Sequence, residues 1–245
     1  MTLIMGILNL TPDSFHEPSR YNYSVLDGPA DIVDIGAVSS RPGASRVSLE
    51  EEWARLEPFL KQLRTDKRIS IDTTRSEIVR RAYRLIGDFI VNDISASEDD
   101  PLMLQTVSEL GMEYIAMHKR GNASDMDSLA VYDDVVEDVL EYFRAFGEKA
   151  ARAGVSRWIL DPGFGFAKTE EQNLTLLDNL SRFKEFGRPI LVGLADKRFT
   201  HGENEKLHRR AILNGADILR VHDPESTVQT VKGLCRSCPA DSPGE

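Results

Sequence analysis

The sequence predicts one α/β domain, a single (β/α)8 TIM barrel, and three observations carry this prediction. The chain has 245 residues, the size that one barrel of this kind requires. Short apolar runs alternate with amphipathic stretches, which is typical of parallel strands joined by crossover helices. Polar side chains follow the ends of these runs, where barrel enzymes hold their chemistry. The eight runs span residues 3–8, 31–35, 69–71, 88–91, 114–117, 158–160, 190–192 and 217–221.

The amphipathic stretches between the runs predict the helices. Apolar residues recur at helical spacing over 48–64, and Ser48 with Glu51 forms a capping box at the start of that stretch. The longest pattern covers 132–153, and Gly154 is its expected stop. Two further stretches behave in the same way, residues 101–110 and 171–186.

Two connections are shorter than a full crossover helix needs. Residues 21–30 leave room only for a turn or a shortened helix after the first strand. Residues 199–215, in the seventh connection, are compact as well. We therefore expect a barrel with shortened first and seventh connections.

Composition excludes several classes of partner. A formal net charge of −10 disfavours a general nucleic-acid or anionic-membrane surface. No run approaches the roughly 18 apolar residues of a membrane span, and strand-like sequence starts at Leu3, so a cytoplasmic protein is expected. Cys235 and Cys238 lie beside the Pro- and Gly-containing end of the chain, which favours a flexible tail over a zinc or redox motif. We predict a barrel over 1–235 and a tail over 236–245.

Asp161 is the most informative single position. It follows a short buried run and precedes Pro162-Gly163-Phe164-Gly165, which continues neither a strand nor a helix, so its carboxylate is expected at a strand's carboxyl end. Glycines there allow a flat molecule to approach the backbone, and a carboxylate suits the N–H edge of an aminopyrimidine-like ring. A plain helix-capping aspartate is the alternative.

Ligand-binding side chains follow every predicted strand, and in a barrel those positions ring one mouth. Each has an ordinary alternative: Asp72 with Thr73 as a helix cap, Asn92 with Asp93 as an Asx turn, His118 as a solvated loop residue, and Arg220 as a surface ion pair. Their joint recurrence favours a functional site. The members are Asn9, Ser39-Ser40-Arg41, Asp72, Asn92, His118, Asp161, Lys197, Arg220 and His222.

The ring divides by chemistry into a slot and a rim. The slot suits a flat heterocycle with amino and ring N–H donors, and the rim suits phosphate oxygens, with Asn9 offering an oxygen to Mg²⁺. A heterocycle bearing a diphosphate is the implied ligand. The slot comprises Asp72, Asn92, Asp161 and Lys197 with Ile94, Met117, Phe164 and Phe166; the rim comprises Asn9, Ser40, Arg41, Arg220 and His222.

These motifs together resemble the dihydropteroate synthases of folate biosynthesis. The resemblance covers nearly the whole chain, and the stretches 5–15 and 161–166 are its most specific parts. The other matching stretches are Asp34-Ile35-Gly36, Ser40-Arg41-Pro42-Gly43, Ile71-Asp72-Thr73, Asn92-Asp93-Ile94-Ser95, Met117-His118 and Arg220-Val221-His222-Asp223.

The resemblance implies an enzyme that joins p-aminobenzoate to 6-hydroxymethyl-7,8-dihydropterin diphosphate, releasing diphosphate, with Mg²⁺ at Asn9 and a homodimeric assembly. Its catalytic positions fall on Asp72, Asp161, Lys197, Arg220 and His222. Pterin positions are Asp72, Asn92, Ile94, Met117, Asp161, Phe166, Gly193 and Lys197; diphosphate positions are Asn9, Ser40, Arg41, Arg220 and His222; p-aminobenzoate positions are Ser40, Arg41, Pro42 and Arg198.

The stretch around Lys197 departs most from the family pattern, while the departures at 37–41 and 117–121 are conservative. The family usually reads Ser-Arg-Lys-Ser where this chain has Ala195-Asp196-Lys197-Arg198. Lys197 is kept, but Asp196 opposes a carboxylate substrate while Arg198 attracts one. A remodelled p-aminobenzoate pocket, which would also alter the response to sulfonamides, is the first hypothesis. A non-catalytic or partner-dependent pterin-binding paralogue is the alternative, and a pterin-dependent methyltransferase is disfavoured because the diphosphate set is present.

Overall fold

The computed structural model describes residues 2–11, 23–38, 47–121, 126–194 and 197–235. Their parallel strands form one sheet in the order β6-β5-β4-β3-β2-β1-β8-β7. A bridge between Leu160 and Ile190, with Leu160 N donating to Pro189 O over 3.0 Å, joins β6 to β7 and closes the barrel. The strands are β1 Leu3–Asn9, β2 Ile32–Gly36, β3 Arg68–Asp72, β4 Ile90–Asp93, β5 Glu113–Met117, β6 Trp158–Asp161, β7 Leu191–Val192 and β8 Ile218–Val221.

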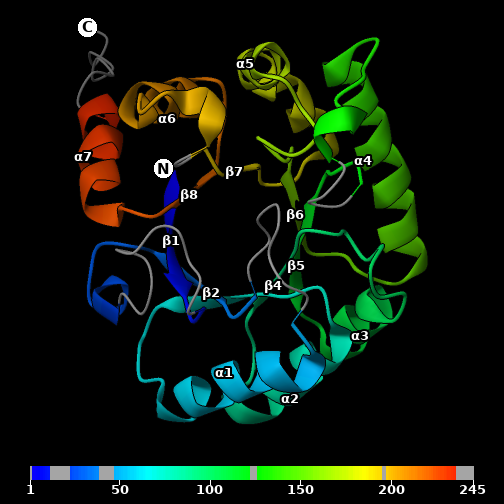
Figure 1. Ribbon diagram of the computed structural model, residues 1–245, viewed down its shortest axis with the longest axis vertical. Coiled ribbons are helices and arrows are strands. Elements are labelled where there is room, and N and C mark those ends of the chain that lie inside the picture. Colours follow the sequence, from blue (N-terminus) through cyan, green and yellow to red (C-terminus); the bar gives the residue numbers. More distant parts are fainter. Residues whose placement is uncertain (1, 12–22, 39–46, 122–125, 195–196, 236–245) are drawn as a thin grey trace, which may run out of the picture.

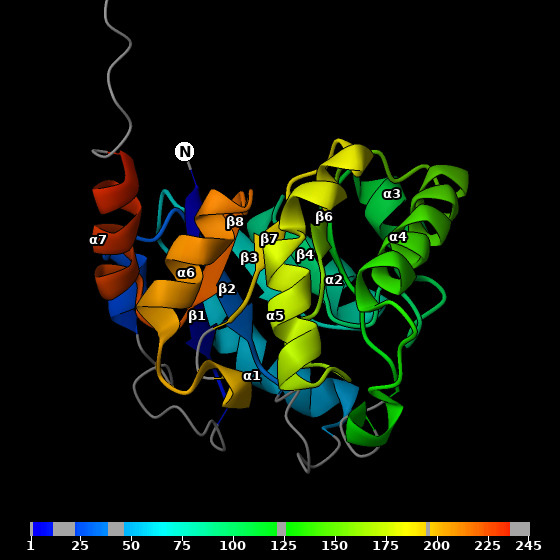
Figure 2. The ribbon, with the colours of Figure 1, turned by 90° about the horizontal axis from the view of Figure 1, so that it is seen from above.

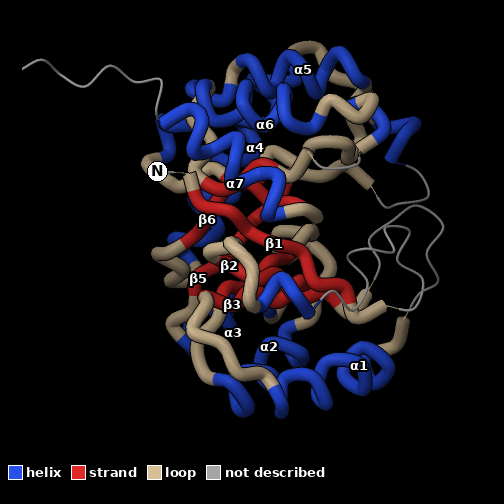
Figure 3. Tube along the Cα trace, turned by 90° about the vertical axis from the view of Figure 1, so that its left-hand side faces the viewer, coloured by secondary structure: helices blue, strands red, loops and turns tan. Residues whose placement is uncertain are grey.

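Helices surround the strands in chain order, from α1 and α2 through α3 to α6 and finally α7 beside β1 (Figure 1). The predicted (β/α)8 barrel is thereby confirmed. Figure 3 shows the strands enclosed by these helices. The helices are α1 Leu49–Gln62, α2 Ser76–Ile86, α3 Met103–Leu110, α4 Val135–Arg152, α5 Glu170–Asp178, α6 Asn204–Leu213 and α7 Pro224–Cys235, with 3-10 turns η2 Tyr23–Leu26, η3 Met126–Leu129, η4 Leu180–Phe186 and η5 Arg198–Thr200.

Capping boxes in the local sequence start two of the helices. The predicted capping box is present at α1, where Ser48 accepts from Glu51 N and Glu51 accepts from Ser48 N. A second box, Thr169 with Gln172, starts α5. The expected single helix over 171–186 is wrong, because it divides at Asn179. The Asn179 side chain donates to Thr175 O over 2.8 Å, so it competes with the helical backbone for that carbonyl.

The first connection is shortened, as the sequence predicted. Between β1 and β2 the described residues form η2 in place of an α-helix. Gly6 explains how so small an element covers the strand: a Cβ there would lie 2.4 Å from Val25 Cγ2 and 2.9 Å from Pro224 Cγ. Strand β1 is thus packed directly against η2 and the start of α7. The seventh connection keeps a full helix, α6, which Figure 2 shows beside α5.

Two separate apolar clusters stabilise the barrel. The larger lies between the strands and the helices, and its largest fully buried side chains include Tyr114 and Phe143. The smaller fills the lumen, with one inward residue from each strand except β3. Alternate residues of a strand point to the same side, so the residue two positions after each member of this cluster also faces the lumen. Its buried members are Met5, Ile32, Ile90, Ile115, Ile159, Leu191 and Ile218.

Within the described ranges, the structure has no helix with the length and apolar character needed to cross a membrane.

Candidate active site

A polar layer lies directly on the apolar floor of the lumen. Two residues beyond each floor position, toward the carboxyl end of the strand, comes the next inward side chain. The floor residue Ile32 is thus followed by Asp34, and Ile218 by Arg220. The layer contains two carboxylates, Asp34 and Asp161, and the amide of Asn92, so it can bind several N–H donors at once. Its members are Ile7, Asp34, Asn92, Met117, Asp161, Gly193 and Arg220.

Arg220 joins three strands through this layer. Its Nε donates to Asp34 Oδ2 over 2.7 Å, and its Nη2 donates to Asp72 Oδ2 over 3.0 Å. Asn92 Nδ2 donates to the same Asp34 oxygen over 3.1 Å. Asp34 is fully buried, and its other oxygen, Oδ1, has no hydrogen-bond partner among the described residues. The layer therefore keeps acceptor capacity beyond what its own donors use.

Burial sets the charge state of this cluster. It raises the pKa of Asp72 to about 7, against the lowering effect of Arg220 and with a further raising effect of Asp34. Burial opposes the charge on Arg220, but Asp34 and Asp72 outweigh it, so the pKa of Arg220 lies above its usual value. The arginine is consequently a permanent cation between two carboxylates that compete for it.

These contacts correct the division into slot and rim. Arg220 was placed in the rim, yet it pairs with Asp72, which was placed in the slot. Arg220 lies deeper in the barrel than Asn9 does. It pairs with Met5 in the sheet, and Asn9 comes four residues later along β1, toward the mouth. The alternative of a surface ion pair is also wrong, because Asp34 is fully buried. Arg220 therefore belongs to the same cluster as the slot residue Asp72.

Asp161 lies at the strand end predicted for it. Its Oδ1 accepts from Gly163 N over 2.8 Å, and the cap of the following helix is Thr169, so the helix-cap alternative is wrong. Burial raises its pKa, against the Gly163 hydrogen bond and the nearby Lys197 and Arg220. Gly163 has φ +71°, and a Cβ there would lie 1.9 Å from His118 O. The loop after β6 is therefore pressed against the end of β5.

The aromatic wall of the slot is Phe166, not Phe164. Lys197 Nζ lies 4.4 Å from the centroid of the half-buried Phe166 ring, a cation–π contact. Phe164 is 1% exposed and belongs to the core between strands and helices, so its predicted place in the slot is wrong. The reason is the turn at Gly165, whose φ of +74° sends the two flanking phenylalanines to different sides.

Two other predicted alternatives are settled by their contacts. Asp93 forms the Asx turn, accepting from Ser95 N over 2.8 Å, while its neighbour Asn92 points into the lumen. His118 is 2% exposed and packs edge-on against Tyr142, so it is neither a solvated loop residue nor part of the open mouth. Burial, with Lys168 nearby, holds the pKa of His118 well below its usual value.

The four strand ends that begin the ring are in register. Asn9 pairs with Gly36, Gly36 with Asp72, and Asp72 with Asn92. A Cβ on Gly36 would lie 3.5 Å from Asn9 Oδ1 and 3.9 Å from Asp72 Oδ2, so both oxygens flank the same glycine. Among the described residues, no three His, Cys, Asp or Glu side chains are grouped to hold a metal. The Asn9 side chain can supply one oxygen to a hard cation, and the described residues offer it no cluster of carboxylates there.

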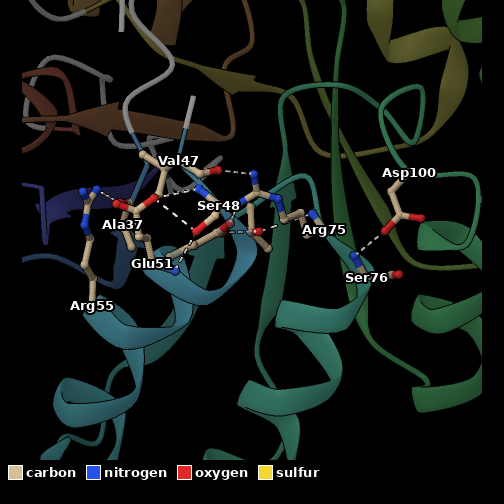
Figure 4. Close-up of polar contacts among 10 residues, drawn as sticks. Ala37, Val47, Ser48, Glu51, Arg55, Arg75, Ser76 and Asp100 are labelled. Carbon is tan, nitrogen blue, oxygen red and sulfur yellow. Dashed lines mark hydrogen bonds and ion pairs between the residues drawn. The ribbon is translucent and has the colours of Figure 1, made fainter. Parts of the chain in front are cut away.

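Part of the predicted site lies outside the described residues. Ser40, Arg41 and Pro42 fall there, as do Asp196 and the side chain of Arg198. The flanks of residues 39–46 are described, and Figure 4 shows both held by arginines. Arg55 donates to Ala37 O over 2.8 Å, and Arg75 donates to Val47 O.

Comparison with known proteins decides the family. A family model described as "Pterin binding enzyme" matches residues 5–222, from β1 to the residue after β8. The chain belongs to this family. Its barrel mouth, with Asp72, Asn92 and Asp161 near the carboxyl ends of β3, β4 and β6, lies within the matched range.

Relatives of the family are similar over almost their whole length. A dihydropteroate synthase of Synechocystis sp. is 41% identical over 94% of this chain and 88% of its own. The dihydropteroate synthase of Yersinia pestis, solved with a sulfonamide drug complex, superposes with a TM-score of 0.88 at 31% identity, covering 96% of this chain and 94% of that one. The enzyme of Xanthomonas albilineans, solved with 4-aminobenzoic acid, gives 0.86 at 34% identity, covering 97% and 94%.

Two residues of the site were missed from the sequence. Asp34 was noted only as part of a family motif, although a carboxylate two residues after the inward Ile32 of a buried strand was the available signal. Lys168 closes the Asp161 loop and was not considered. Its Nζ lies 2.9 Å from Gly163 O and 3.0 Å from His118 Nδ1. No spacing rule in the sequence pointed to that contact.

Proposed function

We propose that the chain is a dihydropteroate synthase in activity, condensing 6-hydroxymethyl-7,8-dihydropterin diphosphate with p-aminobenzoate to give 7,8-dihydropteroate and diphosphate. The amine nitrogen forms a bond to the methylene carbon, the bond from that carbon to the diphosphate oxygen breaks, and the amine loses one proton. Family membership and near-complete coverage of dihydropteroate synthases support the assignment.

The observation that carries this proposal is the carboxylate and amide layer on an apolar lumen floor. A dihydropterin presents an edge of amino and ring N–H donors, and Asp161 on β6 and Asn92 on β4 supply buried acceptor oxygens. Asp34 Oδ1, which has no protein partner in the described part of the chain, adds another. Phe166 and Met117 provide apolar contact for the ring, and Lys197 lies over the Phe166 face. These residues bind and orient the pterin.

Electrostatics account for the bond cleavage. Positive charge develops on the pterin as the carbon–oxygen bond breaks, and the carboxylates of Asp72 and Asp161 favour it. Negative charge gathers on the departing diphosphate, which Arg220 is proposed to stabilise from within the lumen and His222 from the end of β8, together with Ser40 and Arg41. Mg²⁺, when bound at Asn9 and the phosphate oxygens, would supply additional neutralisation of that charge. The aromatic amine needs no strong general base.

A second candidate function concerns the amine half of the reaction. The neighbouring residues 195–198 depart from the family, and a non-catalytic or partner-dependent pterin-binding paralogue is the competing function. One experiment separates the two. Purified chain is incubated with the pterin diphosphate, p-aminobenzoate and Mg²⁺, and dihydropteroate is quantified, while pterin binding is measured separately by calorimetry. Product formation supports the synthase. Pterin binding without product at saturating substrate supports the paralogue.

Mg²⁺, the homodimer and the cytoplasmic location are extensions of this proposal. Omitting Mg²⁺ or adding a chelator should lower turnover without lowering the affinity for a pterin that lacks diphosphate. Light scattering coupled to size-exclusion chromatography tests the homodimer, with a mass of twice 27.4 kDa expected.

A further inference from the structure

Lys168 is enclosed by acceptors in the loop that follows Asp161. Its Nζ lies 2.9 Å from Gly163 O, 3.1 Å from Phe166 O and 3.0 Å from His118 Nδ1. A lysine ammonium has three N–H donors and no acceptor, so these partners satisfy its charged form. The third contact requires a neutral His118 whose proton is on Nε2.

The residues that Lys168 holds are those that face the proposed pterin. Gly163 O and Phe166 O are separated by the turn that brings the Phe166 ring under Lys197. Gly163 N is also the donor to Asp161 Oδ1, so fixing Gly163 fixes the orientation of that carboxylate. Lys168 therefore influences the Asp161 carboxylate and the Phe166 ring indirectly. It bonds the backbone carbonyls of Gly163 and Phe166, and touches neither the carboxylate nor the ring.

His118 provides the rigid base of this arrangement. It follows Met117 at the end of β5, and its backbone N donates to Asp161 O over 2.9 Å. Its ring is 2% exposed and makes an edge-on contact with Tyr142 of α4 at 4.8 Å. Lys168 consequently links the loop after β6 to a side chain that strand and helix already hold in place.

We infer that Lys168 is a positioning residue for pterin recognition, acting through Gly163 and Phe166 and anchored on neutral His118. This inference rests on the proposed function, because it assigns Lys168 to the same site. Burial lowers the pKa of Lys168 to about 7, with the charge of Asp161 acting in the opposite direction. The Lys168 amine has lost its contact with water, and its hydrogen bonds in the loop replace that hydration.

The test compares Lys168→Met with the matched control Lys61→Met, whose lysine is exposed on α1 and paired with Glu57. Calorimetry with 6-hydroxymethylpterin, which lacks the diphosphate, measures the site independently of turnover. We expect Lys168→Met to raise the pterin Kd by about 10-fold or more and Lys61→Met to leave it unchanged. The KM for p-aminobenzoate should stay within about 2-fold in both, because the lost contacts belong to the pterin wall.

An unchanged pterin Kd for folded Lys168→Met, with the wild type binding normally, would overturn the inference. If the wild type binds no pterin, the proposed function fails and this inference with it. If Lys168→Met does not fold, the inference is tested on the wild-type protein. Nitrogen NMR of its histidine rings at pH 6 should show that His118 Nδ1 carries no proton. A proton on that nitrogen would rule out the anchoring contact.

Discussion

Asp34 on β2 accepts a 2.7 Å hydrogen bond from Arg220 on β8, on the inner side of the intervening strand β1. The two residues are separated by most of the sequence, and Asp34 is fully buried. A buried carboxylate without its cation destabilises the folded state. Arg220 therefore stabilises the fold, in addition to its proposed role at the diphosphate. Loss of activity in an Arg220 variant therefore needs a stability measurement beside it.

Replacing Arg220 by methionine should destabilise the ligand-free chain by about 3–5 kcal/mol, because it leaves Asp34 charged and unpaired. Urea unfolding followed by circular dichroism measures this. The double variant Asp34→Asn with Arg220→Met should recover part of the loss, since the uncompensated charge is gone. Additive effects of the two single changes would show that the residues do not interact.

Replacing Asp161 by asparagine should weaken pterin binding by about 100-fold or more, because a charged acceptor of pterin N–H groups becomes an amide. Calorimetry with 6-hydroxymethylpterin measures the change. The exposed Asp133, changed to asparagine, is the control. Equal affinities for Asp161→Asn and the control would remove Asp161 from the pterin site.

The raised pKa of Asp72 predicts a pH-dependent stability. Its ordinary value is 3.8 and its folded value is about 7, so between these values the folded chain holds a proton that the unfolded chain has released. Stability from this group therefore falls as the pH rises through that window. Asp72→Asn does not titrate.

The wild type should therefore lose stability relative to Asp72→Asn as the pH rises from 5 to 8. The difference between their free energies of unfolding should change by about 1–3 kcal/mol in favour of the variant. Chemical denaturation at both pH values, without ligand, provides the measurement. A constant difference across this range would mean that Asp72 does not change its protonation there.

Gly163→Ala should abolish pterin binding, because the added Cβ would lie 1.9 Å from His118 O and push the Asp161 loop off β5. Gly111→Ala is a closely matched control: Gly111 also has a positive φ, +66°, but nothing lies within 4 Å of the added Cβ. It should cost only about 1 kcal/mol of stability, without affecting binding. Similar pterin affinities in the two variants would contradict the close approach.

Restoring the family pattern after β7 should improve the amine half of the reaction. The double change Asp196→Arg with Arg198→Ser removes a negative charge that opposes the carboxylate of p-aminobenzoate. We expect a lower KM for p-aminobenzoate, about 3-fold or more, with the KM for the pterin diphosphate unchanged. Steady-state kinetics with each substrate varied in turn give both values, and an unchanged KM for p-aminobenzoate would place these residues outside its pocket.

Much of the fold was predictable from alternation alone. The eight apolar runs and the capping box at Ser48 depend on local sequence, and both are present. The division of the helix predicted for 171–186 was missed, because it depends on a side-chain bond from Asn179 to a helix carbonyl. Such competition has no periodic signature.

The sequence predicted which residues lie at strand ends, but not always which side of the sheet their side chains face. Asn92 and Asp161 were predicted to lie at the carboxyl ends of strands, and they do, because position along a strand can be inferred from local sequence. Whether a side chain faces the lumen or the helices depends on the parity of the strand and on turns, which is why Phe164 was assigned to the wrong side and Asp34 was overlooked. The contact of Lys168 with His118 joins two separate loops, and only the closed barrel brings them together.

The seam between β6 and β7 is the least paired join of the closed sheet. Strand β7 pairs with β8 over Leu191 and Val192, and it meets β6 through the bridge between Leu160 and Ile190. Among the described residues, every other pair of neighbouring strands shares at least two residue pairs. Transient local opening of the ring is therefore expected to begin at this seam, and to expose the lumen there before the other strands separate.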